Sequence, residues 1–399
     1  MKKSLSIRFS NTIDPLISIF LSFPFMKGRF PKIPGGSAKM KNLNVAIKPL
    51  FLAVMFAGFV LAGGCDQKSA RAPVEKYKYA VILSMQQGGS LLQLYDADGN
   101  FLDSKRLKAS GVDENGSAYL NGPQYENGKW YIGVASDAKS QDFVLELDPE
   151  TLNVKDVPAN VGNRYQYTGY AVDGDHLYAF YSTPDRGAHI IKSSLSSGKM
   201  VKQTEIRHNI LYHIIPNHGS LIFLSDSDDP QDPGMYLRIV DGDSLKIEKE
   251  FKNPDYLFPR DVLLIHDKLY IVPLLDASEM ETNQLLIFDL KNENWETVRL
   301  PFQNARYLRL TDHKLYIFEE NTDADHHTMA IMNLKTNEIE DTVTFDYEAR
   351  EVLIDKDTMV SGSDGKVYIY DLKTLKLKKA FAIKNADDWM FGSLLVKPE

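Results

Sequence analysis

The chain has 399 residues, of which 43% are hydrophobic and 25% charged, and its formal net charge is −8. This composition is typical of a globular protein with a sizeable core and excludes a disordered or fibrous chain. The negative charge and the lack of a basic stripe argue against nucleic acid as a partner. The single cysteine excludes an internal disulfide and a multi-thiolate zinc site.

The first part of the chain has the features of a leader. From Met40 the sequence MKNLNVAIKPLFLAVMFAGFVLAGG runs from charged through apolar to small residues, which predicts a secretory signal peptide over residues 40–64. Its apolar run is shorter than the roughly 20 residues that a membrane-spanning helix needs. Residues 1–39 fit neither a signal nor a domain, so we expect translation to begin at Met40 and these residues to be an upstream extension from a mis-assigned start.

The signal peptide ends in LAGGC, which resembles the lipobox of bacterial lipoproteins. The resemblance implies that Cys65 is acylated, becomes the first residue of the mature chain and anchors it in a cell membrane, facing the extracytoplasmic side in the periplasm or at the cell surface. The alternative is an ordinary cleavage site followed by a buried free thiol. The polar residues 65–75 are expected to form a tether.

Residues 76–399 repeat a unit at intervals of roughly 45 residues, which is the spacing of propeller blades. In each unit a tight turn leads into an aromatic-rich strand, and an alternating strand with a polar turn follows. The first of these two features occurs in NGKWYIG (127–133), DGDHLYAF (173–180), HGSLIFL (218–224), HDKLYIV (266–272), DHKLYIF (312–318) and DKDTMVSG (355–362).

The two ends of this region complement each other. Residues 76–107 supply three outer strands without an inner one, and the C-terminal WMFGSLLVKPE supplies the missing inner strand. Pairing residues 391–396 with residues 79–84 would close a ring without an open edge. We therefore predict an all-β, seven-bladed propeller of four-stranded blades over residues 76–399, monomeric and closed by its C-terminal strand. An all-β sandwich is the alternative, although it would not require such even spacing.

The repeat resembles the quinoprotein-like and YVTN-type seven-bladed propellers over most of residues 76–399. The resemblance implies that ligands bind over the central channel, on the face formed by the loops before each inner strand and the loops between second and third strands. Those second-to-third loops are expected to form an acidic rim. Its residues are Asp137, Asp142, Asp185, Asp226, Asp228, Asp229, Asp232, Asp276, Glu279, Glu281, Glu320, Asp323 and Asp325.

The starts of the inner strands carry arginine and aromatic residues instead. The candidate ligand-binding residues are Arg164, Tyr165, Tyr167, His213, Tyr256, Arg260, Arg306, Tyr307, Arg350 and Trp389. Guanidinium forks and aromatic rings suit carboxylates, sugars and peptide backbones, and Arg260 and Arg306 occupy equivalent positions in their blades. The alternative is structural, with the aromatic rings wedged between blades and the arginines paired with the acidic rim.

Two segments offer ligands to metal ions. SDSDDPQDPG at residues 225–234 could hold calcium through Asp226, Asp228, Asp229 and Asp232, or could be a solvated loop, because it lacks the glycine and terminal glutamate of an EF-hand. NTDADHHT at residues 321–328 is a weaker candidate for a transition metal. No other cofactor is predicted.

The sequence indicates an envelope lipoprotein whose propeller binds or scaffolds a protein, peptide or glycan without catalysis. An envelope enzyme, such as a lyase, a lactonase or a quinone-type dehydrogenase, is the alternative and would need histidines or carboxylates to converge at the channel mouth. The chain contains no GxSxG, HExxH or phosphate-loop motif. A structural sensor or stalk domain is the third interpretation.

Overall fold

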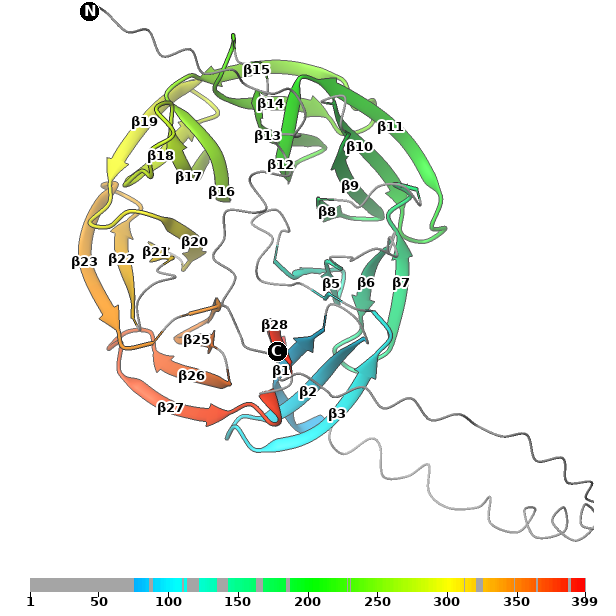
Figure 1. Cartoon of the computed structure of the whole chain (residues 1–399), viewed down its shortest axis with the longest axis vertical. Coiled ribbons are helices and arrows are strands. Elements are labelled where there is room, and N and C mark those ends of the chain that lie inside the picture. The colour runs from blue at the N-terminus through cyan, green and yellow to red at the C-terminus, as the bar shows by residue number, and fades with distance from the viewer. Residues whose placement is uncertain are drawn as a thin grey trace, which may run out of the picture. The chain divides into compact units, whose positions relative to one another are not determined.

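The fold is a closed ring of β-sheets. In a computed structural model, the described residues are 75–85, 89–109, 111–112, 122–134, 143–162, 168–183, 187–227, 229, 231–311, 313–320, 326–347, 349–363, 365–386 and 389–398. They form seven four-stranded antiparallel sheets around a central axis, a β-propeller, as Figure 1 shows. The predicted all-β fold with seven blades is confirmed.

Each blade runs from an inner strand near the axis to an outer strand at the perimeter (Figure 1). The first three blades, from inner to outer strand, are β4 (Gln124–Glu126), β5 (Lys129–Ile132), β6 (Phe143–Leu147) and β7 (Val154–Pro158); β8 (Gly169–Asp173), β9 (His176–Ser182), β10 (Gly187–Ser194) and β11 (Met200–Arg207); and β12 (Asn209–Asn217), β13 (Ser220–Ser227), β14 (Met235–Asp241) and β15 (Ile247–Asn253). The next three are β16 (Tyr256–Ile265), β17 (Lys268–Asp276), β18 (Gln284–Asp289) and β19 (Asn294–Arg299); β20 (Ala305–Leu310), β21 (Lys314–Glu319), β22 (His327–Asn333) and β23 (Glu338–Phe345); and β24 (Glu351–Asp355), β25 (Thr358–Ser363), β26 (Lys366–Asp371) and β27 (Leu377–Ala382).

The seventh blade joins the two ends of the chain. It consists of β28 (Met390–Val396), β1 (Tyr77–Ser84), β2 (Ser90–Asp96) and β3 (Phe101–Leu107). β28 pairs with β1 from Tyr79↔Val396 to Ser84↔Met390, so the predicted closure is confirmed. A Cβ atom on Gly392 would lie 2.6 Å from the carbonyl oxygen of Val112, so this close approach requires glycine.

The hydrophobic core lies between the faces of neighbouring blades. Phe180 of β9 and Phe223 of β13 belong to one buried cluster, and Leu285 of β18 and Leu315 of β21 belong to another. Second strands are therefore buried on both sides and read as continuous apolar runs, as in LIFL of β13. The ring is held together by apolar packing from blade to blade.

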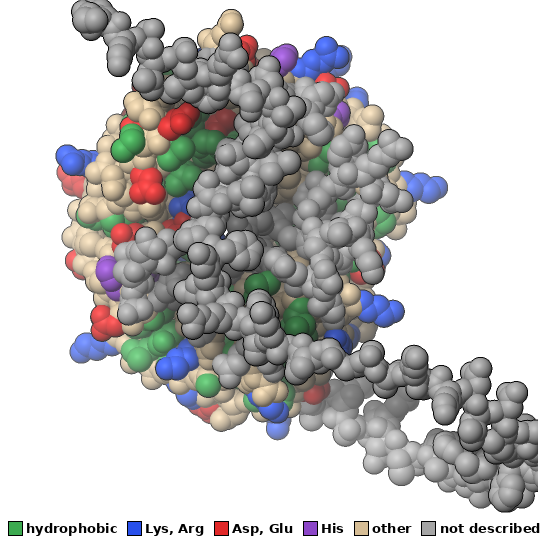
Figure 2. Space-filling view, viewed as in Figure 1, with side chains coloured by type: hydrophobic (Ala, Val, Ile, Leu, Met, Phe, Trp, Pro, Cys, Tyr) green, Lys and Arg blue, Asp and Glu red, His purple; other side chains and the backbone are tan. Residues whose placement is uncertain are grey.

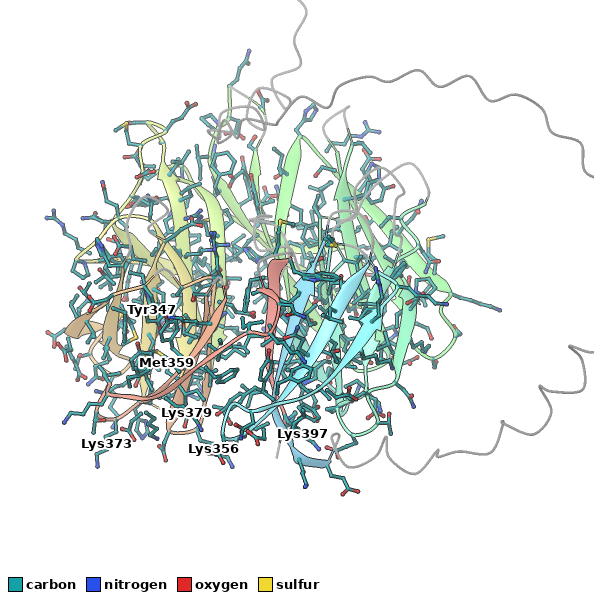
Figure 3. The ribbon with its side chains drawn as sticks, turned by 60° about the horizontal axis from the view of Figure 1, so that its bottom comes forward. Tyr347, Lys356, Met359, Lys373, Lys379 and Lys397 are labelled. Carbon is teal, nitrogen blue, oxygen red and sulfur yellow. The ribbon has the colours of Figure 1, made fainter. Side chains whose placement is uncertain are left out.

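The ring has two faces. The loop face carries the loops before each inner strand and the loops between second and third strands; Figure 2 shows it, with Asp and Glu side chains visible along its rim. The opposite face, which we call the turn face, carries the tight turns between first and second strands and those between third and fourth strands. Lys356 and Lys373 belong to these two kinds of turn and lie at the same edge of the ring (Figure 3).

The predicted N-terminal segments fall outside the described residues, and this applies to the upstream extension, the signal peptide, Cys65 and the tether as far as residue 74. Within the described part of the chain, no helix has the length and apolar character needed to cross a membrane.

Candidate functional site

A β-bulge recurs at the same position in three consecutive inner strands, near the loop face. The register with the second strand shifts between Leu211 and His213 in β12, between Pro259 and Asp261 in β16, and between Ala305 and Tyr307 in β20. A bulge inserts one extra residue and changes the direction in which its side chain points. The extra residues are Tyr212, Arg260 and Arg306.

The next blade continues this pattern. The amide of Arg350 donates to the carbonyl of Gly362 over 2.8 Å, although Gly362 already pairs with Glu351 in the sheet. Two consecutive residues therefore face one residue of the partner strand, which is the geometry of a bulge. Three consecutive blades thus carry arginine at the bulge position: Arg260, Arg306 and Arg350.

Arg260 and Arg306 converge on one carboxylate. Both guanidinium groups form ion pairs with Glu320, which follows β21. The three side chains are only 14%, 15% and 17% exposed, so water screens these charges little. Two guanidinium groups therefore share the carboxylate of Glu320. Nη1 of Arg260 is buried and has no hydrogen-bond partner among the described residues.

The ring of Tyr307 packs against the guanidinium group of Arg306. The guanidinium carbon of Arg306 lies 4.9 Å from the centre of the Tyr307 ring, which is within the range of a cation–π contact. The Tyr307 hydroxyl donates to the backbone carbonyl of Arg350 over 2.5 Å, and burial raises the pKa of this hydroxyl well above its usual value. The Tyr307 ring is therefore held in place by its hydroxyl, which keeps its proton, and the side chain is half-buried.

The residue after each bulge connects its blade to the next one. Ring Nε2 of His213 donates to the carbonyl of Pro259 over 3.0 Å, and burial lowers the pKa of its imidazole. Asp261 accepts from the amide of Leu308 over 2.7 Å. His213 contacts the backbone of the neighbouring blade in this way, at Pro259 and at Arg260, and it does not take part in the ion pairs with Glu320.

The same connection continues to the closing blade. Glu351 accepts from the amide of Leu394 over 2.6 Å and from the hydroxyl of Ser393 over 3.2 Å. Burial raises the pKa of Glu351, while the Leu394 amide opposes this effect. With Tyr307 included, four residues that follow a bulge connect five consecutive blades.

The remaining candidate ligand-binding residues are spread more widely. Tyr256 packs against the apolar cluster between the β12–β15 and β16–β19 blades, and Trp389 packs against the cluster around β28. Arg350 is half-buried. Arg164, Tyr165 and Tyr167 lie outside the described residues. The structure therefore brings together part of the predicted set, centred on Arg260, Arg306 and Tyr307.

Asp226 occupies the same strand position in β13 as Glu320 does after β21. Its carboxyl accepts from the amide of Phe258 over 2.6 Å and from the hydroxyl of Tyr212. Burial raises the pKa of Asp226 to about 8, although both hydrogen bonds act in the opposite direction. Glu320 lies between two arginines, whereas Asp226 is buried and its raised pKa favours the neutral acid at pH 7.

The three proposed calcium ligands that the structure describes have other partners. Asp226 is buried between blades, Asp229 accepts from the amide of Gln231 over 2.9 Å, and Asp232 pairs with Lys252 and with the hydroxyl of Tyr236. Asp228 lies outside the described residues. In the ranges that the structure describes, no group of three or more His, Cys, Asp or Glu residues is placed to hold a metal ion.

His327, one of the two histidines of the weaker metal candidate, is 1% exposed and belongs to the core. Its ring stacks on Phe345 at 4.8 Å, and its Nδ1 donates to the carbonyl of Tyr347 over 2.7 Å. Residues 321–325 of this segment lie outside the described part of the chain.

Sequence reasoning placed Glu320 only in the acidic rim and did not single out Asp261 or Glu351. Asp261 and Glu351 directly follow Arg260 and Arg350 in the chain. An Arg-acid pair repeated at the same blade position was the available signal, because it marks the bulge and the residue after it.

No family model matches the chain. No curated protein matches it either. Among solved structures, it is similar to BamB from Moraxella catarrhalis, with 12% identity, 77% of this chain and 91% of that chain covered, and a TM-score of 0.44. It is also similar to apo AztD from Citrobacter koseri, with 10% identity, coverage of 80% and 97%, and a TM-score of 0.49. The dihydro-heme d1 dehydrogenase NirN has 12% identity, coverage of 80% and 75%, and a TM-score of 0.49. Similarity at this level concerns the arrangement of the strands and not the function.

Proposed function

We propose that this chain is a lipid-anchored, extracytoplasmic binding propeller that holds a carboxylate group of a protein, peptide or glycan at Arg260 and Arg306. One observation carries the proposal: these two guanidinium groups share the single carboxylate of Glu320, and a buried Nη1 of Arg260 lacks a partner in the described residues. Buried polar groups are rarely left without a hydrogen bond, and we assign this donor to an atom of the ligand.

A carboxylate fits this site best. The guanidinium group presents planar pairs of donors that match the two oxygens of a carboxylate. The cation–π contact with Tyr307 and the ion pair with Glu320 keep Arg306 in one orientation, so little side-chain entropy is lost when a ligand binds. The acidic side chains on the rim of the same face oppose non-specific anion binding, which favours a ligand that reaches the arginines with a single carboxylate.

Replacement of Arg260 or Arg306 by Gln is expected to weaken carboxylate binding at least about tenfold each, since a hydrogen bond to a charged group contributes about 1.5–3 kcal/mol. The probes are galacturonate and uncharged peptides with a free C-terminal carboxylate, compared with their methyl esters and amides by titration calorimetry. Arg299→Gln is the matched control, because Arg299 is exposed on the outer strand β19. Equal binding of acids and esters would contradict the proposal.

Replacement of Cys65 by Ala is expected to abolish metabolic labelling of the chain with palmitate and to release it from the membrane fraction, because the acyl chains provide the anchor. Ser69→Ala, a change in the same segment, is the control and should leave both unchanged. Labelled, membrane-bound Cys65→Ala protein would rule out lipidation at this residue.

A further inference from the structure

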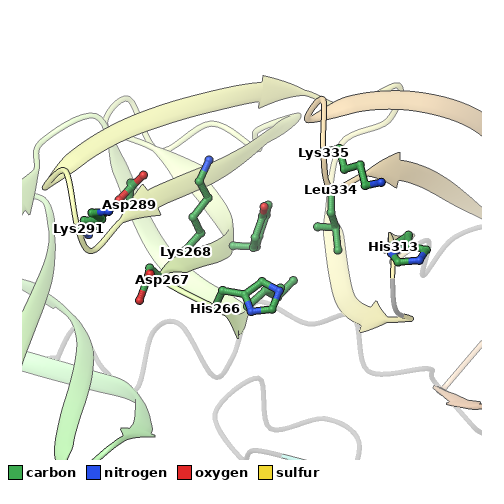
Figure 4. Close-up of a pocket in the computed structure, with 10 residues that line it drawn as sticks. His266, Asp267, Lys268, Asp289, Lys291, His313, Leu334 and Lys335 are labelled. Atoms are coloured by element: carbon green, nitrogen blue, oxygen red, sulfur yellow. Dashed lines mark hydrogen bonds between the residues drawn. The ribbon is translucent and has the colours of Figure 1, made fainter.

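A cavity lies on the turn face, between the β16–β19 and β20–β23 blades. Its volume is about 390 Å³, which suits a small ligand, and Figure 4 shows the residues that line it. Its buried floor includes Ile265 and Tyr270. The arginine pair lies near the other end of the inner strands, so this cavity is separate from the carboxylate site.

The two blades contribute equivalent parts to the cavity walls. Each provides a histidine from the turn between its first and second strands and a lysine from the turn between its third and fourth strands. These residues are His266 and Lys291 in one blade and His313 and Lys335 in the other. Figure 4 shows the two sets on opposite sides of the pocket, with Lys268 rising beside His266.

Backbone hydrogen bonds hold these turns in place. The amide of Leu290 donates to the carbonyl of Asp267 over 2.8 Å, and the amide of Leu334 donates to the carbonyl of His313 over 3.2 Å. In both blades the turn that carries the lysine is thereby fixed to the turn that carries the histidine. The cationic side chains therefore extend from a rigid rim.

The charge of the cavity opposes that of the whole chain, whose formal net charge is −8. Three lysines line it against two aspartates, Asp267 and Asp289. Asp289 already accepts from the amides of Lys291 and Asn292 at 2.9 Å, and the Asn292 hydrogen bonds hold its pKa below the usual value. Within the described part of the molecule, the side chains of Lys291 and Lys335 form no ion pair or hydrogen bond, and the charge of Lys268 acts on Asp289 and lowers its pKa.

We propose that this cavity binds a phosphate-bearing anion. Lysine ammonium groups on flexible stems approach from several sides, which suits the tetrahedral oxygens of a phosphate better than a planar carboxylate. Each imidazole adds an N–H donor in either of its neutral tautomers. A bound phosphate would give Lys291 and Lys335 a charged partner and would add a second one to Lys268, whose charge already acts on Asp289.

The phosphate could come from a soluble phosphate ester or from a lipid headgroup, and the position of the chain's first strand bears on this choice. β1 begins at Tyr77 beside the end of β28, where the amide of Lys397 donates to the carbonyl of Lys78 over 2.8 Å. The chain therefore joins the ring at the turn face. Binding of a lipid headgroup depends on the proposed lipid anchor, which would hold this face toward the membrane. Binding of a soluble phosphate ester does not depend on the anchor.

The test uses the full chain and its double variant Lys268→Gln/Lys335→Gln, with Lys202→Gln on the exposed outer strand β11 as the control. Glycerol phosphate is titrated by calorimetry, and vesicles of phosphatidylglycerol are compared with vesicles of phosphatidylcholine in a flotation assay. We expect the double variant to weaken phosphate binding at least about tenfold per lysine, while the control binds as the parent chain does.

Binding of glycerol phosphate alone would identify a soluble ligand, and a lysine-dependent preference for phosphatidylglycerol vesicles would identify a headgroup; both support the proposal. It is overturned if neither probe binds, or if the double variant binds as well as the parent. Phosphate binding that is lost in Arg260→Gln but kept in the lysine variant would also overturn it, since the anion would then occupy the loop face. Failure of the carboxylate probes leaves this test unaffected.

Discussion

Removal of β28 is expected to abolish cooperative folding of the whole ring. A chain ending at Asp388 loses every backbone pair between β28 and β1, from Tyr79↔Val396 to Ser84↔Met390. It also loses the buried side chains of Phe391, Leu394 and Leu395. Burial of each such side chain contributes about 1.5–3 kcal/mol, so these three approach the roughly 5–15 kcal/mol by which a domain is stable.

The measurement is thermal unfolding followed by circular dichroism, in which we expect the truncated chain to show no sigmoidal transition. The matched control ends at Lys397 and keeps β28 together with the hydrogen bond from the Lys397 amide to Lys78. A peptide of residues 389–399 added to the truncated chain should restore the transition, since it supplies the missing inner strand. A truncated chain that melts as the parent does would show that the ring is stable without closure.

The fold could be predicted from the sequence because its determinants are local and repeated. Turns such as NGKWYIG combine residues that adopt positive φ, here Asn127 at 51° and Gly128 at 76°, with a following apolar strand. Repetition of this unit indicates a ring, and the missing inner strand before Tyr77 indicates how the ring closes. Neither inference needs knowledge of which side chains meet across the ring.

The site could be predicted only in part, because its geometry depends on bulges. Along a regular strand, alternate residues point to opposite faces, but an extra residue reverses this alternation. The sequence therefore identified Arg260 and Arg306 as equivalent, yet could not separate them from His213, which contacts the next blade. The pairing of both arginines with Glu320 depends on contact between two blades and has no counterpart in sequence spacing.

The lysine cavity was not predicted for a related reason. Lysines that follow polar turns, such as Lys291 and Lys335, usually belong to a solvated surface. Their significance depends on two turns of neighbouring blades that face each other across one cavity. The same limit applies to Asp226, which belongs to an acidic segment in the sequence but is 3% exposed in the structure.

Replacement of Asp226 by Asn is expected to stabilise the protein increasingly as the pH rises from about 4 to 8. Burial raises the pKa of Asp226 from 3.8 to about 8, so the folded state retains a proton that the unfolded state has released. The free energy of unfolding is therefore highest below the pKa of the unfolded state. It falls by about 1.4 kcal/mol per pH unit between the unfolded and the folded pKa. The Asn side chain does not titrate, so the variant does not lose stability in this way.

The free energy of unfolding of the variant should therefore exceed that of the parent protein by an amount on the order of 4 kcal/mol at pH 7. A constant cost for the buried amide group reduces this difference. Urea unfolding at pH 4, 5, 6, 7 and 8 measures it, with Asp103→Asn on the exposed outer strand β3 as the control. A difference that does not change with pH would show that Asp226 is ionised in the folded protein. A buried, ionised Asp226 would need a cation beside it. Asp226 and Glu320, which occupy equivalent positions in their blades, would then both form ion pairs.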